Sequence, residues 1–198
     1  MNATRRLILA GAGSLAAVPA RAQIGTLLLS PKTLIEHATE ARSFADQATD
    51  NEIVVKVNAV MAEVGTVEAS TEIYEQRLLI TGLFDDRAKY RRFHAGVQGV
   101  SGIKTLYWHA VYKSAEEQKA DPALISWAMS LELATKAGAN LTLAAKATEM
   151  NYRVCCDAFA VIYVLGRAMS AVEHRRVLAA ARATSGIRKL VDYVLVRA

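Results

Sequence analysis

The sequence predicts an α+β protein made of two tandem modules, each with a three-stranded mixed sheet packed against two helices in the order αββαβ. The first observation behind this prediction is an internal repeat at a spacing of 84 residues. Its matches are Gly82 with Gly166, Arg91-Arg92 with Arg175-Arg176, and Gly102-Ile103 with Gly186-Ile187. The second observation is that helix-spaced and strand-spaced apolar residues alternate within each copy. A register kept over such a distance indicates two copies of one structural unit.

The first 22 residues have the three-part layout of a bacterial export signal. Arg5-Arg6 supplies a positive start, residues 7–18 form a short apolar segment, and Ala20-Arg21-Ala22 is a small-residue cleavage site. The apolar segment is shorter than the roughly 20 residues that a membrane-spanning helix needs. We therefore expect a periplasmic protein cleaved after residue 22, with a retained membrane anchor as the alternative. The paired arginines fit twin-arginine export, and Sec export fits nearly as well.

Residues 23–49 are interpreted as an N-terminal extension and residues 50–113 as the first module. Asp50-Asn51 is expected to cap the first helix of this module, because apolar residues follow at helical spacing from Ile53 to Val64. The other expected elements are strands at 67–73 and 78–83, a helix from the Asp85-Asp86 cap to Gln98, and a strand at 103–112.

Residues 114–123 are polar and are interpreted as a linker that leads to the second module at 124–198. The same order of elements returns there, with expected helices at 124–137 and 171–184 and strands at 151–156, 161–165 and 187–196. For residues 138–150, an extension of the first helix and an ordered loop both remain open.

Both modules resemble BON domains, the small modules of osmotically induced periplasmic proteins and of nodulation-related lipoproteins. The motifs that carry the resemblance best are Asn151-Tyr152-Arg153-Val154, Ile162-Tyr163-Val164-Leu165-Gly166, Ser185-Gly186-Ile187-Arg188-Lys189-Leu190-Val191, and Ser126-Trp127 at the position where these domains often open their first helix. The resemblance covers residues 50–113 and 124–198. It implies a non-catalytic envelope protein that contacts phospholipid and supports outer-membrane integrity or osmotic-stress tolerance.

The hairpin turn departs from the pattern of this family, which often carries Asn-Gly there. The turn reads Glu75-Gln76 in the first copy and Phe159-Ala160 in the second. Because neither copy has a glycine, we expect a different turn type or a longer loop.

The sequence contains no motif typical of a nucleophilic hydrolase, a phosphate-binding loop or a zinc site. Asp85-Asp86 is interpreted as a helix cap and Glu116-Glu117 as part of the solvated linker. The adjacent Cys155 and Cys156 are interpreted as small core residues, because no histidine lies at metal-ligand spacing from them. We therefore expect no catalytic residue, no cofactor and no metal.

Positive charge is concentrated at the C-terminal end. Residues 151–198 contain 8 basic and 3 acidic side chains, whereas residues 23–150 contain 13 basic and 16 acidic ones. Basic groups attract an anionic membrane surface, and Trp favours the boundary between headgroups and acyl chains. The candidate lipid-binding residues are Trp127, Arg175, Arg176 and Arg182. The alternatives are a core or domain-interface role for the tryptophan and a solvated face for the arginines.

Arg91-Arg92 of the first copy are offset by Asp85 and Asp86, so weaker binding of anions is expected there. The expected function is therefore peripheral association with anionic phospholipid through the second module.

A protein–protein module in an envelope assembly is the alternative function. It would be favoured if Tyr107, Trp108 and Tyr112 are exposed on the strand that ends the first module, although the same residues could instead contact the sister domain. Nucleic acid is not expected as a partner of an exported protein. The sequence does not define the lipid, the protein partner or the oligomeric state.

Overall fold

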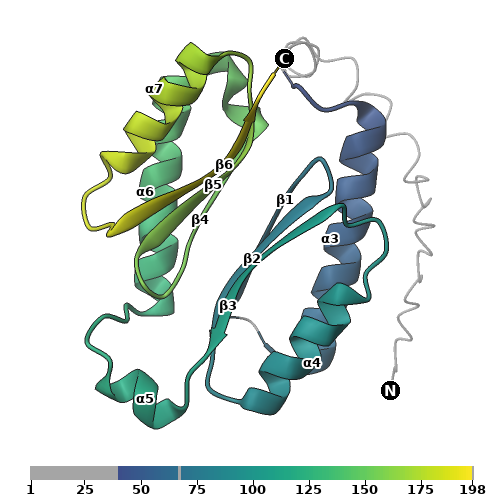
Figure 1. Ribbon diagram of the computed structural model, residues 1–198, viewed down its shortest axis with the longest axis vertical. Coiled ribbons are helices and arrows are strands. Elements are labelled where there is room, and N and C mark those ends of the chain that lie inside the picture. Colours follow the sequence, from purple (N-terminus) through teal and green to yellow (C-terminus); the bar gives the residue numbers. More distant parts are fainter. Residues whose placement is uncertain (1–39, 67, 198) are drawn as a thin grey trace, which may run out of the picture. The chain divides into compact units, whose positions relative to one another are not determined.

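The order helix–strand–strand–helix–strand occurs twice in the computed structural model, which describes residues 40–66 and 68–197 (Figure 1). The first module contains α3 (Phe44–Val64), β1 (Ala69–Tyr74), β2 (Arg77–Phe84), α4 (Arg87–Gln98) and β3 (Thr105–Tyr112). The second contains α6 (Trp127–Ala145), a 3₁₀ helix (Lys146–Asn151), β4 (Tyr152–Cys156), β5 (Val161–Ala168), α7 (Ala171–Arg182) and β6 (Lys189–Val196). The predicted export signal, residues 1–22, lies outside the described residues.

The second strand of each module is the central strand of its sheet. β2 pairs antiparallel with β1 and parallel with β3, and β5 pairs in the same way with β4 and β6. The parallel pairs require a crossover, which α4 and α7 provide. Thr81 lies opposite His109 and, 84 residues later, Leu165 lies opposite Tyr193, so the repeat is kept in strand register. The predicted α+β class with two three-stranded mixed sheets is confirmed.

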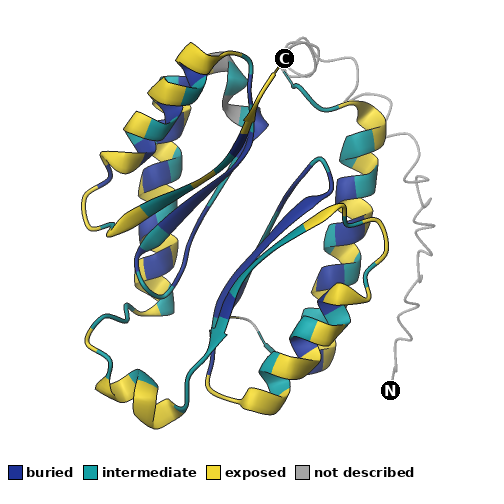
Figure 2. Cartoon of the chain, viewed as in Figure 1, coloured by how far each residue is buried: buried dark blue, intermediate teal, exposed yellow. Residues whose placement is uncertain are grey.

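Two helices cover one face of each sheet (Figure 1). Apolar side chains of α3 and α4 pack with alternate residues of β2, and the main contributors are Ile53, Val57, Phe93, Val97, Leu78 and Ile80. The second module has the equivalent core, built around Leu133, Leu141, Val177, Ile162 and Val164. Figure 2 shows that the exposed positions of these helices lie on the side away from the sheets.

The helix-free faces of the two sheets pack against each other. Tyr74 and Leu79 of the first module form one buried cluster with Cys155, Tyr163 and Leu165 of the second. Tyr107 stacks on Tyr193 across this contact, with ring centroids 3.9 Å apart. Residues 39–198 belong to one compact unit, and the layers within its described part follow the order helices, sheet, sheet, helices.

The first helix begins earlier than the sequence predicts. The prediction that Asp50-Asn51 caps it is wrong, because Ser43 is the N-cap and its Oγ accepts a hydrogen bond from the backbone N–H of Asp46 (3.0 Å). Asp50 is buried within α3, where its carboxylate accepts hydrogen bonds from the backbone N–H groups of Glu75 (2.9 Å) and Gln76 (2.7 Å). A buried carboxylate needs such partners. Asp50 therefore binds the turn of the neighbouring hairpin and does not cap a helix.

The Glu75-Gln76 turn is a two-residue turn, since Tyr74 lies opposite Arg77. Both turn residues have positive φ, 53° and 61°, as a type I′ turn requires. The expectation of another turn type or a longer loop is therefore wrong for the first copy, where the Asp50 carboxylate holds both turn amides. In the second copy the loop is longer, as expected, because residues 157–161 lie between the last paired residues, Cys156 and Ile162.

The predicted linker contains a short helix, α5 (Ala115–Ala120), which begins with a capping box formed by Ser114 and Glu117. The open segment 138–150 extends α6 to Ala145 and then continues as the 3₁₀ helix. Within residues 40–66 and 68–197, no helix has the length and apolar character needed to span a membrane.

Candidate functional site

Arg175, Arg176 and Arg182 lie on the outer face of α7. Ser170 caps this helix and accepts a hydrogen bond from the backbone N–H of Glu173 (3.1 Å). Glu173, Val177 and Ala181 follow at helical spacing and are buried, so they define the inner face. The residues between them, Val172, Arg175, Arg176, Ala179 and Arg182, are exposed and define the outer face. The candidate arginines therefore share one solvent-facing stripe.

This stripe carries unneutralised positive charge. None of the three arginines lies within ion-pair distance of a carboxylate in the part of the chain that the structure describes. The one acid of α7, Glu173, points inward and accepts hydrogen bonds from Tyr152 Oη (2.5 Å) and Thr148 Oγ1 (2.7 Å). Burial and this hydrogen bond raise the pKa of Tyr152 above its usual range. The nearby Asp192 pairs with His174 (2.8 Å).

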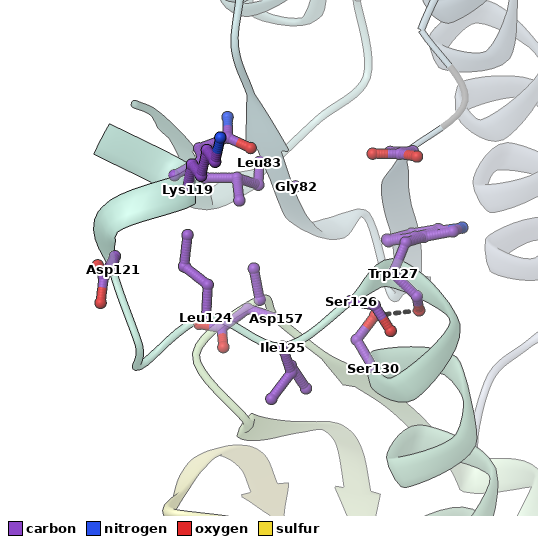
Figure 3. Close-up of a pocket in the computed structure, with 13 residues that line it drawn as sticks. Gly82, Leu83, Lys119, Asp121, Leu124, Ile125, Ser126, Trp127, Ser130 and Asp157 are labelled. Carbon is purple, nitrogen blue, oxygen red and sulfur yellow. Dashed lines mark hydrogen bonds between the residues drawn. The ribbon is translucent and has the colours of Figure 1, made fainter. Parts of the chain in front are cut away.

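Trp127 occupies a different place, at the first residue of α6, directly after the N-cap Ser126. The indole is half-buried and lines a pocket of about 440 Å³. Gly82 and Leu83 of the first module line the same pocket, as do Leu124, Ile125 and Asp157. Figure 3 shows Trp127 on one side of this pocket and Leu83 and Lys119 on the other. Trp127 thus lies where the two modules and their connection meet.

The structure does not bring Trp127 and the arginines together. Two hydrogen bonds show that α6 and α7 run antiparallel. Asn140, within α6, donates one to Thr184 (3.0 Å), which lies just after the end of α7. Thr148, after the end of α6, donates the other to Glu173, near the start of α7. At 1.5 Å per residue, about 20 Å of helix separate Trp127 from the level of Asn140. The predicted site is therefore two separate surfaces on the second module.

Two exposed apolar residues follow Trp127 in α6, on different sides of the helix. Met129 and Leu131 are 43% and 47% exposed, although both are large apolar residues. The charged residues of α6 are Glu132 and Lys136, and these form an ion pair with each other (2.5 Å). The exposed part of α6 thus has little net charge, in contrast to the neighbouring outer face of α7.

The two cysteines are buried and free, as core residues are expected to be. Their side chains lie on opposite faces of β4: Cys155 is in the cluster between the sheets, and Cys156 is in the core of the second module. Burial raises the pKa of Cys156 to about 12 and that of Cys155 well above its usual value, so both thiols stay protonated. In the described part of the chain, no three His, Cys, Asp or Glu residues are grouped to hold a metal ion.

The aromatic residues of β3 are engaged within the protein. Tyr107 stacks on Tyr193 of the sister module, which confirms one of the two roles expected for it. Trp108 Nε1 donates a hydrogen bond to Tyr90 Oη (3.2 Å), and Tyr112 lies 5.8 Å below the Arg87 guanidinium. All three side chains are half-buried, so they do not form the exposed aromatic surface that would favour a protein–protein module.

Charged contacts between the modules were not predicted from the sequence. Arg77 is buried and donates hydrogen bonds to the carbonyl oxygens of Gly166 (2.7 Å) and Tyr193 (2.8 Å). Arg167 donates two hydrogen bonds to the Glu75 carboxylate, at 2.7 and 2.6 Å. The sequence signal that could have predicted them is an arginine near one end of each strongly apolar central strand, where a charged residue is costly unless it is paired.

No protein-family model matches this chain, and no curated protein matches its sequence. Among solved structures, two similar chains are both CdsD, a structural protein of the type III secretion system of Chlamydia trachomatis. The first has a TM-score of 0.32 at 10% identity and covers 74% of this chain and 92% of that one. The second, the C-terminal domain of CdsD, has a TM-score of 0.31 at 10% identity and covers 74% of this chain and 98% of that one. Similarity at this level assigns neither a fold family nor a function to this chain.

Proposed function

We propose that this chain is an exported, non-catalytic protein of the cell envelope that associates peripherally with anionic phospholipid through its second module. The observation that carries the proposal is the outer face of α7, where three exposed arginines have no carboxylate partner among the described residues. Each basic residue near an anionic surface contributes about 1 kcal/mol, so the three together contribute about 3 kcal/mol, or roughly 150-fold in affinity. Binding of this kind is reversible and weakens with salt.

The neighbouring surface of α6 supports the same proposal through different chemistry. Met129 is exposed on the same side of α6 as Asn140, and therefore beside α7, so it offers apolar surface next to the basic face. Trp127 and Leu131 are on the other side of α6, where they line pockets with residues of the first module. A helix with exposed apolar residues beside a basic face lies favourably in the headgroup region without spanning the bilayer. Trp127 is therefore kept as a lipid contact distinct from the arginines.

We also propose that both modules are BON-like. The order αββαβ occurs twice with one register, and the crossover helix lies between equivalent glycines in each copy, Gly82 and Gly102 in the first and Gly166 and Gly186 in the second. This order supports the assignment that the sequence motifs suggest. The role that we propose with it, in envelope integrity or osmotic-stress tolerance in the periplasm, is the one that the resemblance implies.

Co-sedimentation with vesicles tests the proposal. The chain 23–198 retains every described residue, and we expect it to pellet with vesicles that contain phosphatidylglycerol but not with phosphatidylcholine alone. Arg175→Glu/Arg176→Glu should weaken binding by at least about 30-fold, from the loss of two contributions of about 1 kcal/mol. Added salt should weaken wild-type binding as well.

The matched control is Lys56→Glu/Lys104→Glu, which changes the net charge by the same amount at two lysines of the first module, away from α7 and from the pocket that Trp127 lines. This control should bind nearly as the wild type does. Equal losses in both double variants would mean that net charge alone governs binding, and an absence of pelleting with either vesicle would refute the proposal.

A protein partner in an envelope assembly is the second candidate function. The observation that favours it is β6, an edge strand whose last residues, Leu195 and Val196, are apolar and 43% and 39% exposed. An edge strand presents unpaired backbone groups to which another chain can add. Crosslinking in the periplasm from a photoreactive residue at position 195 tests it, and the absence of any protein adduct would exclude this edge.

A further inference from the structure

The outer face of α4 in the first module repeats the outer face of α7. Arg91 and Arg92 occupy the positions of Arg175 and Arg176 in the repeat and are likewise exposed. Neither forms an ion pair with a carboxylate in the described part of the chain. Asp86 is the N-cap of α4, and its carboxylate accepts hydrogen bonds from the backbone N–H groups of Ala88 (2.7 Å) and Lys89 (3.0 Å). Asp85 and Asp86 are both exposed, and the charge of Asp86 lies close enough to Arg92 for the two to interact through space, so these acids offset part of the positive charge of α4, as the sequence suggests.

The layer order turns these two basic faces away from each other. α4 packs on one face of its sheet through Phe93 and Val97, and α7 packs on one face of the other sheet through Val177 and Ala181. The opposite faces of the sheets are in mutual contact. The two outer helix faces therefore lie on opposite sides of the paired modules, and each faces the solvent on its own side.

Distance keeps the two faces electrostatically independent. Layers of secondary structure pack about 10 Å apart, so three spacings place the axes of α4 and α7 roughly 30 Å apart. The screening length at physiological salt is only about 8 Å. A membrane that binds the outer face of α7 consequently leaves Arg91 and Arg92 free to attract a second anionic surface.

We propose that Arg91 and Arg92 form a second anionic-phospholipid surface and that the chain bridges two apposed membranes. This inference rests on the proposed function of the second module. The α4 surface is the weaker one, because Asp85 and Asp86 lie at the start of α4 and the adjacent α3 carries the exposed acid Glu63, whereas the exposed face of α6 beside α7 has no unpaired acid. The order of events is binding through α7 followed by capture of a second membrane through α4.

Vesicle clustering separates bridging from simple binding. The chain 23–198 is mixed with vesicles of phosphatidylcholine and phosphatidylglycerol, and bound protein is measured by co-sedimentation while vesicle size is measured by dynamic light scattering. Wild type should bind and cluster these vesicles, with a maximum in clustering as protein is added, because excess protein saturates both membrane surfaces. Arg91→Glu/Arg92→Glu should abolish clustering while it changes binding by less than about threefold, since α7 is untouched.

The other double variant completes the test. Arg175→Glu/Arg176→Glu, which changes the net charge by the same amount as Arg91→Glu/Arg92→Glu, should lose binding and clustering together. Circular dichroism of each variant confirms that the exposed substitutions leave the fold intact. Binding without clustering would overturn the bridging proposal and leave the proposed function standing, and so would clustering that persists in Arg91→Glu/Arg92→Glu. An absence of wild-type binding would overturn both.

Discussion

Replacement of Asp50 by Ala distinguishes a buried hydrogen-bond acceptor from a helix cap by the size of its effect. The Asp50 carboxylate accepts four hydrogen bonds, which come from the backbone N–H groups of Glu75 and Gln76, Gln76 Nε2 (2.9 Å) and Arg42 Nη1 (2.9 Å). A hydrogen bond to a charged group contributes about 1.5–3 kcal/mol net, and contributions within one network are not additive. We expect Asp50→Ala to lower the free energy of unfolding by about 4 kcal/mol, whereas loss of an N-cap costs about 1 kcal/mol.

The assay is urea unfolding of the chain 23–198, followed both by far-ultraviolet circular dichroism and by tryptophan fluorescence. Coincident transitions with an unchanged slope allow the two free energies to be compared. Asp46→Ala, in the first turn of the same helix, is the matched control and should cost less than about 1 kcal/mol. An Asp50→Ala loss of about 1 kcal/mol or less would refute the assignment of Asp50 as the residue that holds the turn.

Gln76→Gly tests the same contact from the side of the turn. Gln76 has a φ of 61°, a conformation that costs a residue with a side chain about 1 kcal/mol and costs glycine little. In the wild type, Gln76→Gly also loses the side-chain hydrogen bond to Asp50, whereas in the Asp50→Ala background that bond is already absent. The substitution should therefore be more favourable in the variant background by about 1 kcal/mol. Additive effects would mean that the carboxylate does not stabilise this turn.

Two further predictions concern the half-buried acid Glu72 and a pair of equivalent glycines. Burial raises the pKa of Glu72 to about 7, and the nearby Arg153 opposes this shift in part. Because the folded state then favours the protonated carboxyl group, the free energy of unfolding falls as the pH rises from 4.5 to about 7. Glu72→Gln should unfold with a free energy higher than wild type by roughly 1–2 kcal/mol at about pH 8 and equal to it at about pH 4, and an identical difference at both pH values would contradict this. Gly166→Ala should destabilise by more than about 3 kcal/mol, because a Cβ there would overlap the carbonyl oxygen of Asn151. Gly82→Ala, at the equivalent position, should cost only about 1 kcal/mol, because its Cβ would lie 3.0 Å from the nearest backbone oxygen. Equal losses of both variants in urea unfolding would show that the two glycines are not packed as described.

The repeat was sufficient to predict the topology, because apolar periodicity and turn glycines are local signals. Ser43 and Asp50 show where such signals fail. Either residue is a good N-cap by type, and the sequence does not reveal that Asp50 faces a hairpin more than twenty residues later. The amides of the Glu75-Gln76 turn provide the partner, and a partner of this kind is known only once the helix has been placed on the sheet.

The candidate site was predicted in part for the same reason. The spacing of Arg175, Arg176 and Arg182 is enough to place them on one helix face, and the structure agrees. The relation of Trp127 to that face depends on the antiparallel packing of α6 and α7, which sequence spacing does not encode. The helices separate Trp127 from the arginines, so the indole and the guanidinium groups must be tested as independent contacts.

The contact between the modules uses the positions at which the two copies differ. Arg77 corresponds to Val161 in the repeat, and Arg167 corresponds to Leu83, so neither charged contact between the modules has a counterpart with the copies exchanged. Tyr107, which stacks on Tyr193, corresponds to Val191. A first module packed against another first module would place Leu83 where Arg167 lies, so the largely buried Glu75 carboxylate would lose both hydrogen bonds that Arg167 donates, and a buried charge that loses its partner is strongly unfavourable. The repeat therefore determines the fold of each module, and the departures from it determine that the two modules pair with each other and not with copies of themselves.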